Sequence, residues 1–257
     1  MSEIVILKIG GSVLTDKNKI SAPKPDEIAR MAREISDGKN TKLVLIHGAG
    51  SFGHHQAKEY RLKDGLNDRS IKGILPTHNA VKALNKMILD ALHINGVDSL
   101  PVHPLSSCVL RDGRIEHMCI EAIELMLEHD IVPVLHGDVA MDATRGEDVL
   151  SGDQLVEYLA KTLNAKRVGI GTNVDGVYDE QQHVIRSITP ASFETIKGAL
   201  LGSSGVDVTG GMYGKIMELM KLAEAGIPSQ VFNAEKPGNI TGFLKNKLTE
   251  GTFIRGE

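Results

Sequence analysis

The sequence predicts an α/β protein, a three-layer αβα sandwich with a mostly parallel central sheet. Short runs rich in Val, Ile and Leu alternate along the chain with longer segments whose apolar residues recur at helical spacing. The short runs are almost continuously apolar, which is typical of strands covered on both faces. Strand–helix–strand units repeated in this way give right-handed crossovers, and hence parallel strands between two layers of helices.

The elements follow in chain order from these two patterns. Six runs are predicted to be strands: residues 4–10, 42–48, 98–104, 131–137, 165–172 and 229–234. Five segments with helical spacing are predicted to be helices, several of them ending in Gly or Asn: residues 24–38, 78–96, 119–130, 152–164 and 210–226. In such a sheet, ligands bind beyond the carboxyl ends of the strands.

The chain shows no internal repeat and no linker long enough to separate independent domains, so we expect a single domain over residues 1–257. Two charged, glycine-bearing patches interrupt the pattern, residues 61–73 and 140–149. A solvated loop is the simpler interpretation of each patch, and a mobile lid or a hairpin over the substrate is the alternative.

Composition narrows the class of function. The 257 residues are 41% hydrophobic, enough for a large core. A net charge of -4, no Trp and 4% aromatic residues do not provide the basic surface or the stacking platforms of a nucleic-acid-binding protein. No apolar run reaches the roughly 20 residues of a membrane span. Cys108 and Cys119 lack the spacing of a metal or redox motif. We therefore expect a soluble, unprocessed cytoplasmic protein without a structural metal.

Glycine-bearing turns follow four of the predicted strands and precede one helix. Their sequences are KIGGSVLT, HGAGSFGH, HGDVA, GTNVDGVYD and, before the helix, DVTGGMYGK. Glycine lets backbone N–H groups approach an anion closely, and a helix N-terminus adds partial positive charge. One such turn is weak evidence, but several at one edge of a sheet predict a site for more than one phosphate.

Lys8 stands inside the first strand, shortly before the turn at Gly10 to Ser12. An ammonium group in a strand with covered faces needs an anionic partner, and a phosphate at that turn would supply one. The turn matches neither the P-loop nor the dinucleotide-binding pattern. Lys17 and Lys215 can reach the same place from two other loops, although a purely surface role is the alternative for Lys17.

Taken together, these motifs resemble the amino acid kinase superfamily, which includes acetylglutamate, uridylate and carbamate kinases. The matching motifs are LKIGGSVLTDK, HGAGSFGH, HGDV with LSGD, GTNVDGVY and DVTGGMYGK, in the order of the family and over essentially the whole chain. Through GSFGH and SGD the sequence is most similar to the isopentenyl phosphate kinases. Asn173 departs from the pattern, because relatives commonly have Asp there, so no carboxylate role is assigned to that position.

The resemblance implies transfer of the γ-phosphoryl group of Mg-ATP to isopentenyl phosphate, giving isopentenyl diphosphate and ADP. Because a phosphate acceptor is already largely ionised, the reaction needs charge neutralisation and in-line positioning more than a general base. The resemblance also implies dimethylallyl phosphate as a second acceptor, Mg²⁺ carried by the nucleotide, a homodimer and a role in isoprenoid precursor synthesis. Residues up to about 165 would bind the acceptor, and residues from about 166 the nucleotide.

The family pattern assigns roles to individual residues. Catalytic roles fall to Lys8, Lys17, His54, Asp153 and Lys215. ATP would contact Lys8, Gly10, Gly11, Ser12, Gly50, Thr172, Asp175, Tyr178, Gly214 and Lys215. The acceptor would contact Gly48, Ala49, Gly50, His54, Met87, Ile88, Gly137 and Gly152. Asp153 would orient the lysines, and capping of the helix that follows is an alternative and compatible role.

Two adjacent histidines follow the second glycine turn. His54 is expected in the first helical turn, where its ring would point back toward the loop. His55 lies about 100° further round the helix, so the two rings should not face one phosphate. The resemblance selects His54 to bind the acceptor phosphate, and its proton would be taken up with the substrate, because a phosphate dianion favours imidazolium. His55 is interpreted as a surface residue, and His47 and His136 as supporting donors or core residues.

An isoprenoid tail requires an apolar slot beside the phosphate. Leu84, Met87 and Ile88 on an amphipathic helix are candidates, although core packing is the usual role of such residues. Val149 and Leu150 are further candidates.

Two other functions stay open. Another phosphotransferase of the superfamily, such as a fosfomycin-type or small-phosphonate kinase, would also use a histidine against a phosphorus oxyanion. An acetylglutamate kinase would need a carboxylate clamp, and Arg61 comes too late in its helix to provide it. A nucleotide-sensing module could dispense with Lys8 and Lys215, and the presence of both favours catalysis.

Overall fold

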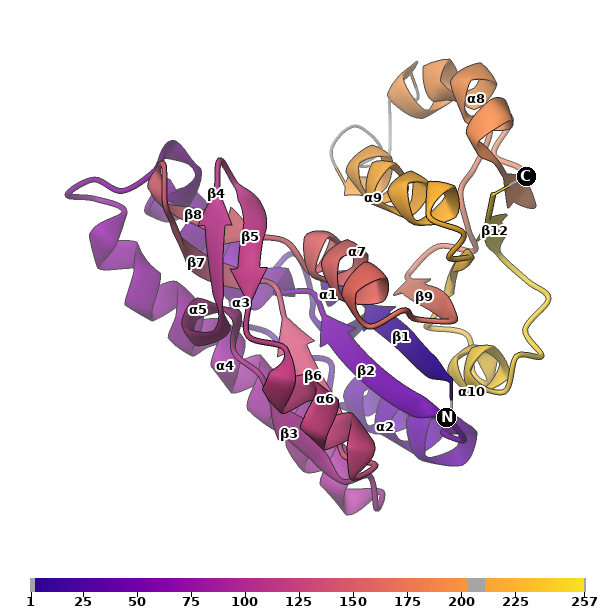
Figure 1. The fold of residues 1–257 in the computed structure, drawn as a ribbon, viewed down its shortest axis with the longest axis horizontal. Coiled ribbons are helices and arrows are strands. Elements are labelled where there is room, and N and C mark those ends of the chain that lie inside the picture. The colour runs from indigo at the N-terminus through magenta and orange to yellow at the C-terminus, as the bar shows by residue number, and fades with distance from the viewer. Residues whose placement is uncertain (1–2, 203–210, 257) are drawn as a thin grey trace.

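The structure is a computed structural model that describes residues 3–202 and 211–256. Its centre is an eight-stranded sheet with the order β10-β12-β11-β9-β1-β2-β6-β3 (Figure 1). Neighbouring strands of this sheet are parallel except for β11 and β12. The strands are β1 (Ile4–Ile9), β2 (Lys42–His47), β3 (Ser99–Pro101), β6 (Val132–His136), β9 (Arg167–Thr172), β10 (Ser187–Ile188), β11 (Ser229–Asn233) and β12 (Thr252–Ile254).

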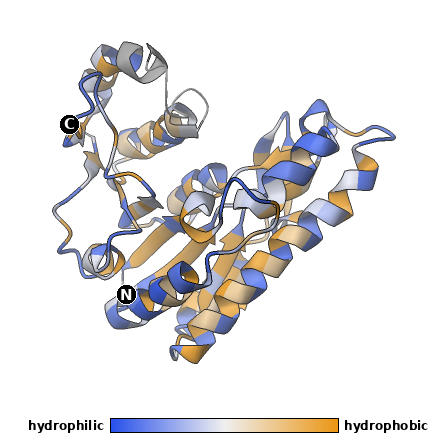
Figure 2. Cartoon of the chain, turned by 180° about the vertical axis from the view of Figure 1, so that it is seen from behind, coloured by the Kyte–Doolittle hydropathy of each residue, from blue (hydrophilic) through white to orange (hydrophobic). Residues whose placement is uncertain are grey.

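Alternating residues of the central strands face two separate cores. Ile6 and Ile46 belong to the core on one face of the sheet, and Val5 and Leu7 to the core on the other. The first face is covered by α6 (Glu121–Glu128), α7 (Gly152–Thr162), α8 (Pro190–Gly202) and α9 (Tyr213–Glu224). The second is covered by α1 (Gly11–Leu14), α2 (Pro25–Gly38), α3 (Gly50–Glu59), α4 (Ile71–Ile94) and α10 (Asn239–Leu244). Figure 2 shows the apolar strands between helices, which confirms the predicted sandwich.

A second sheet of four strands, in the order β5-β4-β7-β8, lies beside the central sheet and is absent from the sequence-based prediction. Its strands are β4 (Cys108–Arg111), β5 (Arg114–Met118), β7 (Asp138–Asp142) and β8 (Gly146–Leu150). The patch 140–149 forms most of the β7–β8 hairpin, so the hairpin interpretation of this patch is confirmed and the solvated loop is wrong. The patch 61–73 holds a short 3-10 helix (Leu62–Asp64) and the start of α4.

The predicted elements are all present, with shifted ends. The six predicted strands lie in the central sheet, and the five predicted helices correspond to α2, α4, α6, α7 and α9. Helix α4 begins at Ile71, seven residues earlier than predicted. Residues 207–210 of the motif DVTGGMYGK lie outside the described residues. None of the described helices combines the length and the apolar character needed to cross a membrane.

Candidate active site

The glycine turns converge on one cavity of about 1880 Å³, at the carboxyl ends of β1, β2, β6 and β9. Small-molecule pockets usually measure roughly 300–1,000 Å³, so this cavity has room for two substrates. Most of the predicted site residues line it: Lys8, Gly10, Gly11, Ser12, Lys17, Gly48, Ala49, Gly50, His54, Gly137, Gly152, Asp153, Thr172, Tyr178 and Lys215.

A charged cluster of Lys8, Asp153 and Lys215 lies in this cavity. Lys8 is an even-numbered residue of β1 and therefore faces α7, where Asp153 occupies the first turn. The Lys8 Nζ lies 2.6 Å from one carboxylate oxygen of Asp153, and the Lys215 Nζ lies 3.2 Å from both oxygens. Capping of α7 falls to Ser151, whose Oγ accepts a hydrogen bond from the Gln154 amide at 3.2 Å. The alternative role of Asp153 as the cap is therefore wrong.

Burial shapes the charge of the cluster. It lowers the pKa of the Lys8 ammonium to about 8, against the opposing attraction of Asp153. Burial alone would raise the pKa of Asp153, but Lys8 and Lys215 outweigh it and hold that pKa at about 2. Two ammonium groups around one carboxylate leave an excess of positive charge, which suits a phosphoryl group.

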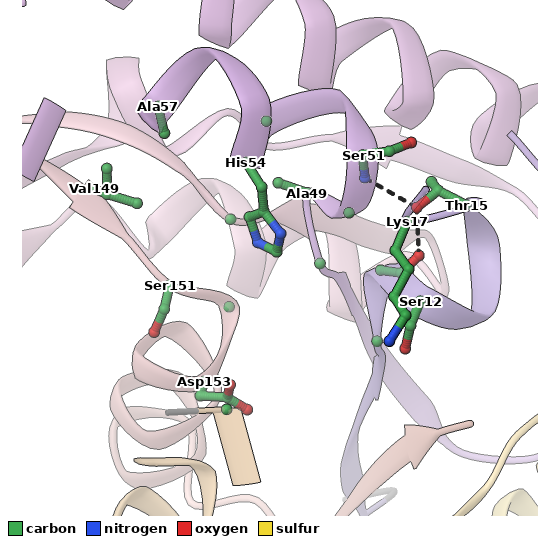
Figure 3. Close-up of a pocket in the computed structure, with 18 of the residues that line it drawn as sticks. Ser12, Thr15, Lys17, Ala49, Ser51, His54, Ala57, Val149, Ser151 and Asp153 are labelled. Atoms are coloured by element: carbon green, nitrogen blue, oxygen red, sulfur yellow. Dashed lines mark hydrogen bonds between the residues drawn. The ribbon is translucent and has the colours of Figure 1, made fainter. Parts of the chain in front are cut away.

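The glycine turns after β1 and β2 touch through their backbones. A Cβ at Gly11 would lie 2.4 Å from the Gly50 nitrogen, and a Cβ at Gly48 would lie 2.6 Å from the Gly11 nitrogen. Thr15 joins the turns, because its Oγ1 donates to the Gly11 carbonyl at 2.8 Å and accepts from the Ser51 amide at 3.0 Å (Figure 3). The two glycine turns, each predicted to bind an anion, therefore lie side by side.

Asn173 from the C-terminal half, and Lys24 together with Glu235, hold the first turn in place. The Ser12 hydroxyl donates to Asn173 Oδ1 at 3.1 Å. The Lys24 ammonium donates to the Ser12 carbonyl and to Glu235 Oε1, each at 2.9 Å. Asn173, the residue that departs from the family pattern, therefore fixes the turn through a hydrogen bond and not through a charge.

His54 extends from α3 into the cavity. Figure 3 shows its ring between Val149 and Ala49, with the Lys17 side chain reaching toward Ser12. Helix α3 begins at Gly50, so His54 is one residue beyond the first turn in which it was expected. His55 also borders the cavity, where its exposed Nδ1 lies 3.7 Å from Glu59 Oε2. The cavity is wide enough for both rings to line it at separate places.

Backbone amides face a small space at the acceptor end. A Cβ at Gly137 would lie 3.4 Å from both the Gly152 nitrogen and the Leu150 carbonyl oxygen, and 3.9 Å from the Ala49 nitrogen. The absence of a side chain at Gly137 thus leaves a gap between two amides, one from the second glycine turn and one from the N-terminus of α7. Such a gap fits a phosphate oxygen. We name it the amide gap.

The apolar wall near His54 differs in part from the predicted one. Val149 and Leu150 line the cavity as predicted. Met87 and Ile88 do not, and their assignment to the substrate is wrong. The Met87 side chain is exposed, and Ile88, like Leu84, is fully buried in the core.

Helix α4 instead reaches the cavity with Thr77 and Val81, which sequence reasoning missed. Their spacing of four residues puts them on one face of the helix, one to two turns before the buried Leu84 and Ile88. This spacing could have identified them from the sequence. Asp138 also lines the cavity, and its position directly after the turn at the end of β6 was a second signal.

Two predicted nucleotide contacts lie off the cavity wall. The Asp175 carboxylate accepts a hydrogen bond from Asn233 Nδ2 and pairs with Lys236, both at 2.9 Å. These partners lower the pKa of Asp175. Gly214 is exposed on α9, directly before Lys215. Neither residue is brought to the cavity with the others.

Comparison with known proteins places this chain in one class of protein. The model of the amino acid kinase family matches residues 3–233. The chain belongs to that family, and it is therefore a kinase, an enzyme that transfers a phosphoryl group.

Within the family, the chain is similar to isopentenyl phosphate kinases. It is 40% identical to that enzyme of Methanothermobacter thermautotrophicus, over 99% of this chain and 100% of the relative. It is 41% identical to that of Haloferax volcanii, over 99% of both chains. A solved structure of isopentenyl phosphate kinase superposes with a TM-score of 0.85 at 36% identity, covering 98% of this chain and 100% of the other.

Proposed function

We propose that the protein transfers the γ-phosphoryl group of ATP to the phosphate of isopentenyl phosphate, giving isopentenyl diphosphate and ADP. One observation carries the proposal. A single cavity joins the Lys8, Asp153 and Lys215 cluster to His54 and an apolar wall, with two touching glycine turns between them. The relatives named isopentenyl phosphate kinase, which match over nearly the full chain, support the same reaction.

In this proposal the two halves of the chain hold the two substrates. Residues from about 166 onward, with the turn at Gly10 to Ser12, hold ATP, and the earlier residues hold the acceptor. The sheet changes from one half to the other between β1 and β9, directly beside Lys8. Lys8 therefore lies where the transferred group would cross.

The chemistry then needs few groups. An oxygen of the acceptor phosphate forms a bond to the γ-phosphorus, and the bond from that phosphorus to the β,γ-bridging oxygen breaks, leaving its electron pair on ADP. Lys8 and Lys215 neutralise the charge on the transferred group, and Asp153 holds both ammonium groups in place. Lys17 approaches from the exposed rim. His54 binds the acceptor phosphate, which is largely a dianion at neutral pH because its second pKa is about 6.

Phosphoryl transfer from ATP uses Mg²⁺, which would neutralise charge on the phosphates of the nucleotide. Asp153 is already paired with two lysines, and within residues 3–202 and 211–256 no three His, Cys, Asp or Glu side chains are grouped to hold a metal. We therefore propose that the ion arrives on the nucleotide and that the protein binds it through the phosphates.

The apolar wall sets the class of acceptor. Val81, Val139, Val149, Leu150 and Ala57 line the cavity near His54 and would cover a short hydrocarbon tail. This wall has no feature that separates the two isomeric five-carbon tails, so we include dimethylallyl phosphate as an acceptor. Supply of isoprenoid precursors follows as the role of the product.

The test is release of ADP from Mg-ATP with a panel of acceptors: isopentenyl phosphate, dimethylallyl phosphate, fosfomycin, N-acetylglutamate, uridine monophosphate and carbamate. We expect turnover with the two prenyl phosphates alone. Faster turnover of fosfomycin than of the prenyl phosphates would show that the protein is a phosphonate kinase. Binding of ATP without turnover of any acceptor would favour a sensor.

We also propose a homodimer in a reducing, cytoplasmic compartment. Met87 and Ile94, seven residues apart on one face of α4, and Leu100 on the edge strand β3 are exposed apolar side chains at one side of the molecule. Both cysteines are free. Light scattering after size exclusion gives the mass, and a monomer at micromolar concentration would rule out the dimer.

A further inference from the structure

Two buried imidazoles lie directly behind the acceptor turns. His47 ends β2 and His136 ends β6, and the two residues are in register on adjacent parallel strands. Both side chains are fully buried, their ring centroids are 5.5 Å apart, and neither lines the cavity. Each is followed by a glycine that does line it, Gly48 and Gly137. The same arrangement therefore occurs twice, side by side.

Both rings are neutral at neutral pH and carry their single proton on Nδ1. Burial lowers the pKa of His47 to about 4 and that of His136 to about 3. The Nδ1 of His47 lies 3.1 Å from the Gly48 carbonyl oxygen, and that of His136 lies 3.1 Å from the Gly137 carbonyl oxygen. A carbonyl oxygen can only accept, so Nδ1 must donate in each ring, and Nε2 is left as an acceptor.

The surroundings supply donors to both Nε2 atoms. His103 donates through Nδ1 to His136 Nε2 at 2.9 Å. The Asn85 Oδ1 lies 3.1 Å from His47 Nε2, and the Nδ2 of the same amide group has no partner among the described residues. A half-turn of the amide group exchanges these two atoms. Because Nε2 accepts, the amide group presents its nitrogen there. Two short chains of donors result: His103 donates to His136, which donates to the Gly137 carbonyl, and Asn85 donates to His47, which donates to the Gly48 carbonyl.

These bonds decide which backbone group faces the acceptor. In a planar trans peptide the N–H points opposite to the preceding C=O. With the Gly48 carbonyl drawn to His47, the Ala49 N–H points away from the ring, and no acceptor in the described chain receives it. With the Gly137 carbonyl drawn to His136, no oxygen of that peptide projects into the amide gap between Ala49 and Gly152.

We propose that His47 and His136 are positioning residues, whose Nδ1–H groups hold the carbonyls of Gly48 and Gly137 away from the amide gap, so that neither of these two oxygens opposes an acceptor phosphate bound beside the Ala49 and Gly152 N–H groups. The inference rests on the proposed function, because it places the acceptor phosphate in that gap. Loss of either histidine should therefore weaken binding of the acceptor phosphate and leave binding of ATP unchanged.

The experiment compares His47→Leu and His136→Leu, which lack the donor, with His47→Asn and His136→Asn, whose Nδ2 can replace Nδ1. KM is measured separately for isopentenyl phosphate and for ATP. We expect the Leu variants to raise the acceptor KM at least tenfold with the KM for ATP within twofold. The Asn variants should stay within about threefold of the unmodified enzyme. His93→Leu is the matched control, because His93 Nε2 donates to the Ser99 carbonyl oxygen at 2.8 Å, near the C-terminal end of α4, and His93 does not line the cavity.

A second readout does not depend on turnover. In ¹H–¹⁵N spectra, the Ala49 amide resonance should shift when isopentenyl phosphate is titrated into the unmodified protein, and His47→Leu should abolish the shift. An equal rise of both KM values, or Leu variants indistinguishable from Asn variants, would overturn the inference and leave the proposed function standing. No turnover of isopentenyl phosphate by the unmodified enzyme would instead reject the proposed function, whereas the Ala49 resonance would still report whether the amide gap binds a phosphate.

Discussion

Asp153 contacts both lysines of the charged cluster, so a change at this one residue alters three charges. In Asp153→Asn, two buried ammonium groups would lose their counter-ion, and the pKa of Lys8 would fall further below about 8. We expect kcat to fall about 100-fold, with the fold retained. Steady-state kinetics and thermal unfolding measure the two quantities. Asp90→Asn is the control, because Asp90 pairs with Lys86 at 2.6 Å on an exposed surface. Full activity of Asp153→Asn would contradict the role given to the cluster.

His54 gives a second expectation at the same scale. Imidazole changes charge between pH 5 and 8, and a phosphate dianion binds the protonated ring more strongly. The KM for isopentenyl phosphate should therefore rise with pH between 6 and 8, relative to that of His54→Gln measured in parallel, which corrects for ionisation of the acceptor. His55→Gln should keep the dependence of the unmodified enzyme. Identical pH profiles for the enzyme and His54→Gln would sink the assignment.

Single residues were predictable where their chemistry conflicts with their surroundings. Lys8 is a charged residue in a buried strand, and a buried charge indicates that an anionic partner lies nearby. Met87 and Ile88 give no such indication, because an apolar residue on an amphipathic helix can pack equally well in the core or on a pocket wall. Which face of α4 meets the cavity is decided by how the helix packs on the sheet, and Thr77 and Val81 were missed for that reason.

Among the elements, the touching turns after β1 and β2 tolerate the least change. In Gly48→Ala, the added methyl group would lie 2.6 Å from the Gly11 nitrogen, where no flexible side chain can give way. We expect a loss of about 1–3 kcal/mol in the free energy of unfolding, together with loss of activity as the turns separate. Urea unfolding checks the first and ADP release the second.

Gly242→Ala on α10 is the control for that change, because its methyl group would make ordinary contacts with Leu248 at 3.5 Å or more. Replacing glycine in a helix with alanine should leave stability unchanged or raise it. If Gly48→Ala were as stable and active as Gly242→Ala, the close approach of the two turns would not matter.

The central strands could be predicted because burial on both faces makes them continuously apolar. The edge strand β10 and its neighbour β12 have only two and three residues, too few to form a pattern. The β4–β5 hairpin did carry a signal that was missed. Asp112 and Gly113 both have positive φ, 50° and 75°, as a two-residue hairpin turn requires, and Asp-Gly is the sequence typical of that turn.

At the scale of the whole molecule, buried neutral histidines link stability to acidity. The pKa of His47 is about 4 in the folded chain and about 6.5 when unfolded, so below pH 6.5 the unfolded chain takes up a proton that the folded chain refuses. The stabilisation is complete above pH 6.5 and is lost as the pH falls toward 4, by about 3 kcal/mol for this residue. His136 acts in the same direction.

The free energy of unfolding, measured in urea at pH 7.5, 6 and 5, tests this link. The unmodified protein should lose stability faster than His47→Asn as the pH falls, and the difference between the two should reach more than 1 kcal/mol by pH 5. His129→Asn, at an exposed position, serves as the reference. Parallel curves for all three proteins would show that His47 is not the linked group.

Strand β1 lies in the middle of the central sheet, between β2 and β9. Strand β2 ends at His47, within the first 50 residues, whereas β9 spans Arg167–Thr172. During synthesis on the ribosome, one edge of β1 therefore has no native partner until more than 160 residues have been made. Lys8, to which the proposed reaction assigns the transferred group, is among the first residues to be made, yet its strand has both of its partners only after β9 has been made.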